Sequence, residues 1–156
     1  MSGTEATLYE VAGGAAWITL NRPENRNALS AVLVNELNEH LITANNDPDV
    51  RSIVITGSDP AFCAGADLKS PPGEAIDGGG KSVPYPDVLT RILDSQKPVI
   101  VAVNGAAFAG GLGLVGAADI VITAEDAQFS FSEVRIGVIP AVISVVCLPK
   151  LGTHHG

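Results

Sequence analysis

The sequence is short of basic residues and of cysteine. Its 156 residues hold nine Lys and Arg against seventeen Asp and Glu, which gives a formal net charge of −8. Because an acidic surface repels phosphate groups, this composition disfavours nucleic acid and anionic membranes as partners. Cys63 and Cys147 are the two cysteines, and their spacing fits no metal-ligand pattern. We therefore expect reduced thiols, no metal site and a cytoplasmic location.

The first residues also lack the features of a secretory leader. The stretch MSGTEATLYE has neither a basic region nor an apolar run, so we expect no signal peptide. With 46% hydrophobic residues, the chain has enough apolar side chains to build a core, which argues against disorder. Its length predicts a single domain over residues 1–156.

Charge is missing altogether from a central stretch, residues 99–118. A β-branched run from Val99 to Val103 is followed by Asn104-Gly105, by Gly110-Gly111 and by an apolar segment. This order predicts a strand, a glycine-rich turn and a helix. Such a turn presents free backbone N–H groups and the positive end of a helix dipole, which together suit an anion.

Three interpretations of this uncharged stretch are open. A run of this length could span a membrane, although its five glycines and the absence of flanking positive charge argue against a span. Residues 111–116 match the glycine pattern of dinucleotide-binding turns, but the predicted strand ends several residues too early. The third interpretation is a turn that donates hydrogen bonds to an oxyanion formed during a reaction.

The rest of the chain predicts alternating strands and helices. Ser30 is a plausible N-cap, and Asp47-Pro48 should end the helix that follows it. Residues 71–86, which include three successive glycines, are expected to form a long loop. The expected strands are 7–11, 15–20, 52–57, 119–123 and 127–131, and the expected helices are 31–45, 87–95, 112–118 and 142–151.

Two further segments carry residues of possible chemical interest. In residues 58–68, small side chains around Gly65 would let a ligand approach the backbone closely. This segment is either a plain loop or the start of a helix at Ala66-Asp67. Glu133 has apolar neighbours, so it is either a functional carboxylate held partly out of water or a surface partner of Arg135.

Five groups of residues carry a resemblance to a known family. They are Asn21-Arg22-Pro23 with Asn27-Ala28-Leu29-Ser30, Phe62-Cys63-Ala64-Gly65-Ala66-Asp67-Leu68, Val103-Asn104-Gly105 through Gly110-Gly111, Ala118-Asp119-Ile120, and Phe131-Ser132-Glu133 through Gly137-Val138-Ile139-Pro140. In order and spacing they resemble the crotonase superfamily, the enoyl-CoA hydratases and isomerases. The resemblance overrides the dinucleotide interpretation, because family members place this turn against a thioester.

The resemblance implies an α/β fold, a crotonase-like spiral of ββα units with two roughly perpendicular sheets flanked by helices. Members usually assemble as trimers or dimers of trimers, so we expect a homotrimer or hexamer. They normally continue into C-terminal helices that cover the acyl pocket and make the trimer contacts. This chain lacks that region and is therefore expected to be either a fragment or a natural truncation.

The resemblance also assigns roles to individual residues. The backbone N–H groups of Ala66 and Gly110 would form an oxyanion hole for a thioester carbonyl, and Glu133 falls on a catalytic glutamate of the hydratases. Coenzyme A would be bound as part of the substrate, with no separate cofactor. The adenine would meet the Ala64 carbonyl, and residues 26–29 would flank the pantetheine and phosphates. The expected substrate-binding residues are Arg26, Ala28, Leu29, Ala64, Ala66, Asp67, Leu68, Gly110 and Gly111.

These roles agree with the chemistry of thioesters. Removing a proton α to a thioester places negative charge on the carbonyl oxygen, and two preorganised N–H donors stabilise it. Losing one such donor typically costs about 3 kcal/mol. A carboxylate near the reacting carbons can then move the proton.

One departure from the family leaves the reaction open. Hydratases usually carry a second glutamate three residues beyond the oxyanion-hole glycine, where this chain has Gly113. An enoyl-CoA hydratase is the expected enzyme, with an enoyl-CoA isomerase as the close alternative. A different class also stays open, a non-catalytic protein that binds CoA esters or a partner subunit.

Overall fold

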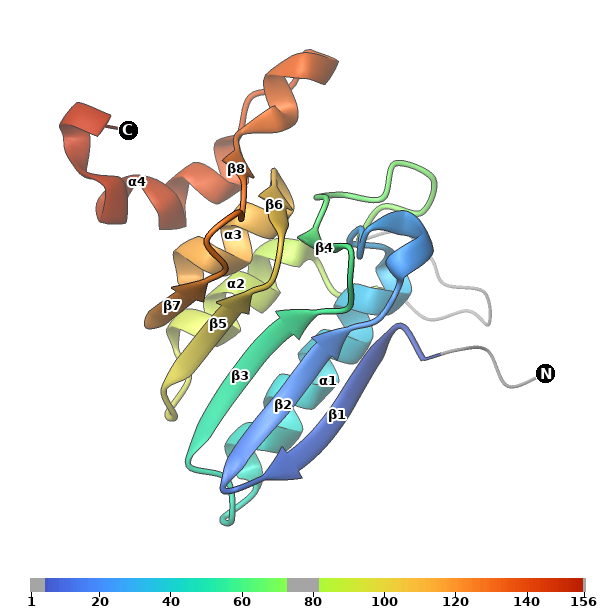
Figure 1. Cartoon of the computed structure of the whole chain (residues 1–156), viewed down its shortest axis with the longest axis vertical. Helices are drawn as coiled ribbons and strands as arrows, with labels where there is room; N and C mark the ends of the chain where they lie inside the picture. Colours follow the sequence, from blue (N-terminus) through green and yellow to red (C-terminus); the bar gives the residue numbers. More distant parts are fainter. Residues whose placement is uncertain (1–4, 73–81, 156) are drawn as a thin grey trace.

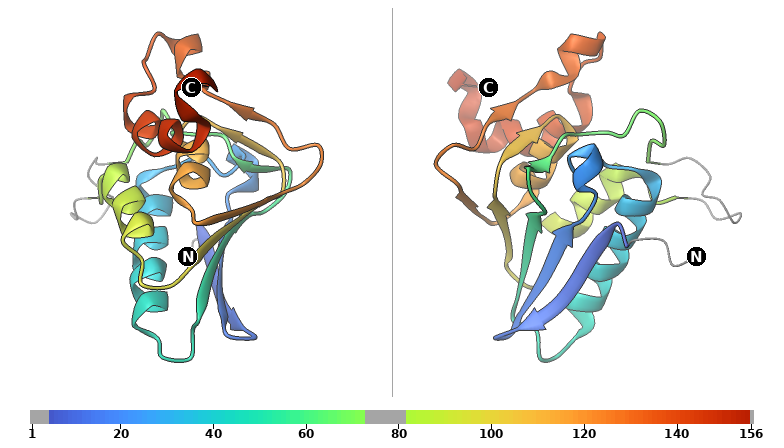
Figure 2. Two further views of the ribbon diagram at one scale, coloured as in Figure 1. Left: turned by 90° about the vertical axis from the view of Figure 1, so that its left-hand side faces the viewer. Right: turned by 45° about the vertical axis from the view of Figure 1, so that its right-hand side comes forward.

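The structure, a computed structural model, describes residues 5–72 and 82–155. They form a five-stranded sheet with the order β1-β2-β3-β5-β7 and a three-stranded sheet with the order β4-β6-β8 (Figure 1). Helices α1 and α2 lie on one side of the large sheet (Figure 2). The expected α/β architecture with two sheets is confirmed.

The large sheet begins with the expected hairpin. Strands β1 (Thr7–Ala12) and β2 (Ala15–Leu20) pair in antiparallel register. Gly13 and Gly14 join them with φ angles of 60° and 81°, a left-handed conformation that glycine adopts without steric cost. The hairpin therefore follows from the alternating pattern and the two glycines between the strands.

The remaining strands of this sheet are parallel. β3 (Ser52–Gly57) pairs with β2, β5 (Val99–Val103) with β3, and β7 (Ile120–Thr123) with β5. The apolar side chains of β3 are buried, and those of β5 alternate between buried and partly buried, as expected for strands in the middle of a sheet. After β5, Asn104-Gly105 leads into the short strand β6 (Ala106–Phe108), and the turn at Ala109-Gly110 follows β6.

The first helix, α1 (Ala31–Asn46), has the predicted boundaries within one residue. Ser30 caps it, because its Oγ accepts a hydrogen bond from the Leu33 amide at 3.2 Å. Its C-cap is Asp47, as the Asp-Pro pair predicts. The buried face of this helix comprises Ala31, Leu33, Val34, Leu37, Asn38, Leu41 and Ala44.

The second half of the chain differs in detail from the expectation. Two strands were not predicted, because each is only three residues long and is defined by pairing with a distant segment. Helices α2 and α3 each begin two residues before the predicted start. The elements are β4 (Ala61–Cys63), α2 (Tyr85–Leu93), β6 (Ala106–Phe108), α3 (Gly110–Ala117), β8 (Phe129–Ser130) and α4 (Ala141–His155).

Two alternatives from the sequence are wrong. Residues 99–118 are a strand, a second strand and the eight-residue helix α3, and no helix in the described ranges is long and apolar enough to cross a membrane. Ala66-Asp67 does not begin a helix within the described residues, where Ala66 forms an isolated β-bridge and a turn follows at residues 68–69. Residues 73–81 of the expected long loop lie outside the described residues.

Candidate active site

Two loops that are far apart in sequence are joined by backbone hydrogen bonds. The Leu29 amide donates to the Gly65 carbonyl at 2.8 Å, and the Asp67 amide donates to the Leu29 carbonyl at 3.1 Å. Between the same two loops, the Ala64 amide donates to the Arg26 carbonyl at 3.0 Å. Leu29 and Ala66 thus form a short parallel bridge that fixes the Ala66 peptide.

The glycine-rich turn packs directly against this bridge. A Cβ atom built on Gly65 would lie 2.8 Å from the Ala109 Cβ and 3.4 Å from the Gly110 nitrogen, and Gly65 has φ +98°. Both the close contact and the backbone angle therefore require glycine here. A Cβ built on Gly110 would lie 3.8 Å from the Ala66 nitrogen. The backbone nitrogens of Ala66 and Gly110 are consequently neighbours.

Both of these N–H groups are available to an outside acceptor. Gly110 is the first residue of α3, where helical N–H groups have no acceptor within the helix. In the part of the chain that the structure describes, neither Ala66 nor Gly110 donates a backbone hydrogen bond to another protein group. Ala66 is exposed, so solvent or a ligand can reach it.

Ala109 holds a strained backbone conformation at this point. Its φ of 46° and ψ of −120° are rare for a residue with a side chain. The strand pairing sustains this conformation, because the Ala109 amide donates to the Ser130 carbonyl at 2.9 Å. Strain of this kind costs of order 1–3 kcal/mol and concentrates at functional sites. Here it sets the direction of the peptide that carries the Gly110 N–H.

Asn27 fixes the loop of residues 26–29 through side-chain hydrogen bonds. It is fully buried, and its side-chain amide donates to the carbonyls of Ser58 at 2.7 Å and Ala61 at 2.8 Å. Its Oδ1 accepts from the Arg22 amide at 2.8 Å. The sequence did not predict this role, although asparagine tolerates the observed φ of 55° better than most residues.

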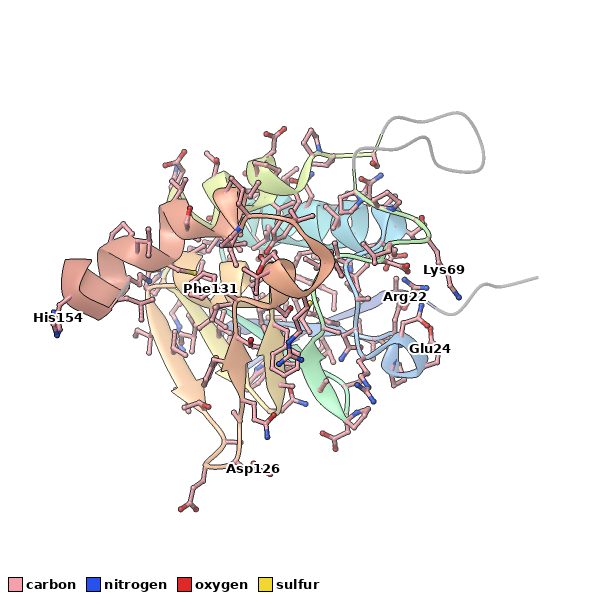
Figure 3. All side chains as sticks on the ribbon, turned by 90° about the horizontal axis from the view of Figure 1, so that it is seen from above. Arg22, Glu24, Lys69, Asp126, Phe131 and His154 are labelled. Carbon is pink, nitrogen blue, oxygen red and sulfur yellow. The ribbon has the colours of Figure 1, made fainter. Side chains whose placement is uncertain are left out.

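An ion pair between Arg22 and Asp67 also links the two loops that carry Asn27 and Ala66. The Arg22 guanidinium donates to the Asp67 carboxylate at 2.9 Å, and their side chains are 24% and 10% exposed. Burial alone would raise the pKa of Asp67, but the hydrogen bond and charge of Arg22, with two backbone amides, hold it below its usual value. Figure 3 shows Arg22 beside Glu24 and Lys69 at this end of the molecule.

Tyr85, at the start of α2, reaches the glycine-rich turn from the helical side. Its hydroxyl donates a hydrogen bond to the Gly110 carbonyl. Burial raises the pKa of this phenol well above its ordinary value, so the hydroxyl keeps the proton that it donates to Gly110. Nothing in the local sequence marks Tyr85, because the contact spans 25 positions along the chain.

Glu133 lies in a 3-10 segment, η2 (Ser132–Ile136), just after β8. Its Oε2 atom is buried and has no hydrogen-bond partner among the described residues, and the structure shows no ion pair with Arg135 there. The pKa of the Cys147 thiol is raised to about 11, first by burial and then by the negative charge of Glu133. A buried carboxylate oxygen without a donor is costly and is typical of a functional group.

The structure brings most of the predicted site residues together. Residues 26–29, 64–68 and 110–111 meet around the Ala66 and Gly110 nitrogens, with Arg26, Ala66 and Leu68 on the exposed side. Glu133 follows three residues after Ser130, whose carbonyl accepts the hydrogen bond from the Ala109 amide. No group of three or more His, Cys, Asp or Glu in residues 5–72 and 82–155 could hold a metal ion.

Comparison with known proteins places this chain in a family. The family described as "Enoyl-CoA hydratase/isomerase" matches residues 10–155. The mitochondrial enoyl-CoA hydratase of Pongo abelii is 46% identical over 125 residues, which are 79% of this chain and 42% of that protein. Carnitinyl-CoA dehydratase of Salmonella enteritidis is 43% identical over 136 residues, 86% of this chain and 51% of that protein.

A solved structure shows the same fold. The crystal structure of a putative enoyl-CoA hydratase/isomerase from Legionella pneumophila superposes with a TM-score of 0.86 at 36% sequence identity, over 97% of this chain and 60% of that one. The chain spans about half the length of the curated relatives it matches. It belongs to the enoyl-CoA hydratase/isomerase family and has the crotonase fold.

Proposed function

We propose that this chain carries the acyl-CoA site of an enoyl-CoA hydratase or isomerase. In this proposal a thioester carbonyl binds between the N–H groups of Ala66 and Gly110. As a proton leaves the carbon next to the thioester, negative charge develops on that oxygen, and the two donors stabilise it. Glu133 is the acid or base that moves the proton.

The observation that supports this proposal best is the pair of adjacent backbone donors. They come from loops about 44 positions apart, they lie side by side, and neither is used within the described structure. Both are fixed before any ligand arrives, Ala66 by its bridge to Leu29 and Gly110 by the strained turn at Ala109. Preorganised donors need no reorganisation during reaction, which is the physical basis of oxyanion stabilisation.

The assignment of Glu133 rests on its unsatisfied carboxylate oxygen. A structural glutamate in a half-buried position would find a cation or an amide, because an unpaired buried acceptor costs about 1–3 kcal/mol. The Glu133 Oε2 finds none in the described residues. A substrate proton is the partner we assign to it.

The coenzyme part of the substrate would follow the first two loops. We assign the adenine to the carbonyl of Ala64 and the pantetheine and phosphates to residues 26–29, whose Arg26 side chain is exposed. The substrate-binding role of Ala28, Asp67, Leu68 and Gly111 belongs to the same proposal. A homotrimer or hexamer of a single domain would be its working form.

Hydration and isomerisation differ in what they ask of the site. Adding water needs a group that activates the water as well as one that protonates carbon, whereas shifting a double bond needs one carboxylate that moves a proton. Our proposal assigns proton transfer to one carboxylate, that of Glu133, and Gly113 has no side chain that could supply a second. Relatives include both an enoyl-CoA hydratase and a carnitinyl-CoA dehydratase, so the acyl group is also a matter for experiment.

A pair of absorbance assays tests the proposal directly. Hydration of crotonyl-CoA removes the conjugated thioester and its ultraviolet absorbance, while isomerisation of a β,γ-enoyl-CoA creates it. We expect at least one of these changes, with saturation in substrate. If purified protein binds CoA thioesters but changes neither absorbance, it is a binding protein, the second candidate. Absence of binding would overturn both.

A further inference from the structure

We propose that Tyr85 is a positioning residue that fixes the Gly110 peptide and so holds the two backbone donors together. This inference rests on the proposed function, since it concerns the geometry of the same site. Tyr85 comes from α2, which contributes no other residue to the site. Its hydroxyl donates to the carbonyl of Gly110, the residue whose backbone lies beside the Ala66 nitrogen.

The sequence of α3, the helix that Tyr85 contacts, stabilises the first helical turn poorly. Four of the eight residues of α3 are glycine, and each glycine in a helix interior costs about 1 kcal/mol relative to alanine. The N-cap residue, Ala109, offers no side-chain hydrogen bond to the first turn. A hydrogen bond from outside the helix therefore replaces part of the stability that the sequence of α3 lacks.

The ring of Tyr85 also lies close beside the first turn of α3. A Cβ built on Gly110 would lie 3.6 Å from Tyr85 Cε1 and 3.8 Å from the Ala66 nitrogen. On the next turn, a Cβ built on Gly113 would lie 2.9 Å from the Tyr85 hydroxyl. The phenol thus occupies the space beside α3 into which a side chain at position 113 would project.

The chain offers a matched control for this hydroxyl. It has two tyrosines, and Tyr9 also has a buried hydroxyl, but that group has no hydrogen-bond partner among the described residues. Tyr9 lies on β1, where its ring stacks on His40 at 5.0 Å between centroids. Tyr85→Phe and Tyr9→Phe therefore remove the same atom, with and without a bond to Gly110.

The first measurement needs no ligand. Amide hydrogen exchange followed by NMR reports the backbone of residues 109–114 in wild type and in both variants. Loss of one ordinary hydrogen bond corresponds to about a 3- to 10-fold change in an opening equilibrium, so these amides should exchange faster by that factor in Tyr85→Phe. Tyr9→Phe should leave them unchanged. Unchanged exchange in Tyr85→Phe would overturn the inference, whatever the protein binds.

The second measurement reads the donors themselves. Sorboyl-CoA, a conjugated dienoyl thioester, absorbs at longer wavelength when hydrogen bonds polarise its carbonyl. At saturating protein, the probe should show a smaller red shift with Tyr85→Phe than with wild type, and its Kd should stay within about threefold of wild type. In the absorbance assays of turnover, kcat of the variant should be about tenfold lower. A merely structural role would weaken binding and lower Tm but leave the shift at saturation intact, which would also overturn the inference. If wild type fails to bind the probe, the proposed function falls and the exchange experiment alone decides on Tyr85.

Discussion

Gly110 can be tested separately as a hydrogen-bond donor and as a small residue. Gly110→Pro removes the N–H, and proline is tolerated at the first position of a helix. Gly110→Ala keeps the N–H but adds the same Cβ, which meets the Leu29 Cδ1 at 2.7 Å. We expect the proline variant to lose about 100- to 1,000-fold in kcat, and the alanine variant to lose far less.

Steady-state kinetics of both folded variants checks this expectation. Equal kcat values for the proline and alanine variants would mean that the Gly110 N–H does not act on the substrate.

Glu133 can be tested through the reaction and through its neighbour. Glu133→Gln should lower turnover by about 100- to 10,000-fold while CoA-ester affinity stays nearly constant. Because the Glu133 charge contributes to the raised pKa of Cys147, the same variant should bring that pKa below about 11. Thiolate absorbance during a pH titration measures the second effect without substrate. Full activity together with a lowered Cys147 pKa would make Glu133 a structural residue.

The ion pair between Arg22 and Asp67 predicts a pH dependence of stability. Because the folded-state pKa of Asp67 is lowered, its contribution is complete above the ordinary aspartate value of about 4, and it is lost as the pH falls through the folded-state pKa. Asp67→Asn should therefore cost about 1–3 kcal/mol at neutral pH and progressively less in acid.

Urea denaturation between neutral pH and pH of about 3 measures this difference. Asp126→Asn, on the exposed loop labelled in Figure 3, is the control and should have no effect at any pH. A cost for Asp67→Asn that is the same at every pH would contradict the ion-pair account.

At the scale of the elements, the sequence predicted what local chemistry decides. The hairpin, α1 and β5 were predicted because alternation, a serine cap and a β-branched run are local signals. Strands β4 and β6 were missed because three residues of Ala, Phe and Cys carry no periodicity, and only pairing between β4 and β6, and of β6 with β8, makes them strands. Tertiary context decided these elements.

The same limit applies to the site. The positions of Ala66 and Gly110 were expected from the resemblance, and the structure shows their nitrogens as neighbours. The supports of these residues were not expected, because Asn27 and Tyr85 reach carbonyls more than 20 positions away. Which side chain satisfies a particular carbonyl depends on the packing of the whole chain.

The helix α3 gives a prediction about its own glycines. A Cβ on Gly111 would lie 2.4 Å from the Cys63 carbonyl oxygen, which belongs to the backbone of β4 and cannot move aside. A Cβ on Gly113 would meet the ends of two side chains, Ile143 Cγ2 at 2.7 Å and the Tyr85 hydroxyl at 2.9 Å. Overpacking typically costs about 1–3 kcal/mol, and we expect Gly111→Ala to exceed that range and Gly113→Ala to fall within it.

Chemical denaturation of the two variants measures their free energies of unfolding and shows which change is the more destabilising. If Gly113→Ala is the more destabilising change, then α3 does not pack on β4 as described.

At the scale of the whole molecule, apolar side chains gather on the C-terminal part of the surface. Ile139 and Val145 are 76% and 72% exposed, and Ile122 on β7 and Val134 in η2 are exposed as well. In Figures 1 and 2, α4 projects beyond the large sheet at this end. Exposed apolar surface of this extent is typical of an interface.

We therefore expect the protein to self-associate through this surface. Sedimentation velocity should show oligomers at micromolar concentration, and replacing Ile139 and Val145 together with serine should shift the protein towards monomer without lowering its stability. Val32→Ser, at a 43% exposed position on α1, is the control and should leave association unchanged. A wild-type protein that stays a stable monomer would contradict this prediction.

The bond between the Ala109 amide and the Ser130 carbonyl has a consequence for synthesis. Chains emerge from the ribosome N-terminus first, and domains fold as enough residues become available. The hairpin and α1 use neighbouring residues and can form early, whereas the parallel strands must close long loops. The turn that carries Gly110 is complete only after residue 130 has left the exit tunnel, so the hairpin and α1 can form in the nascent protein before the proposed oxyanion site.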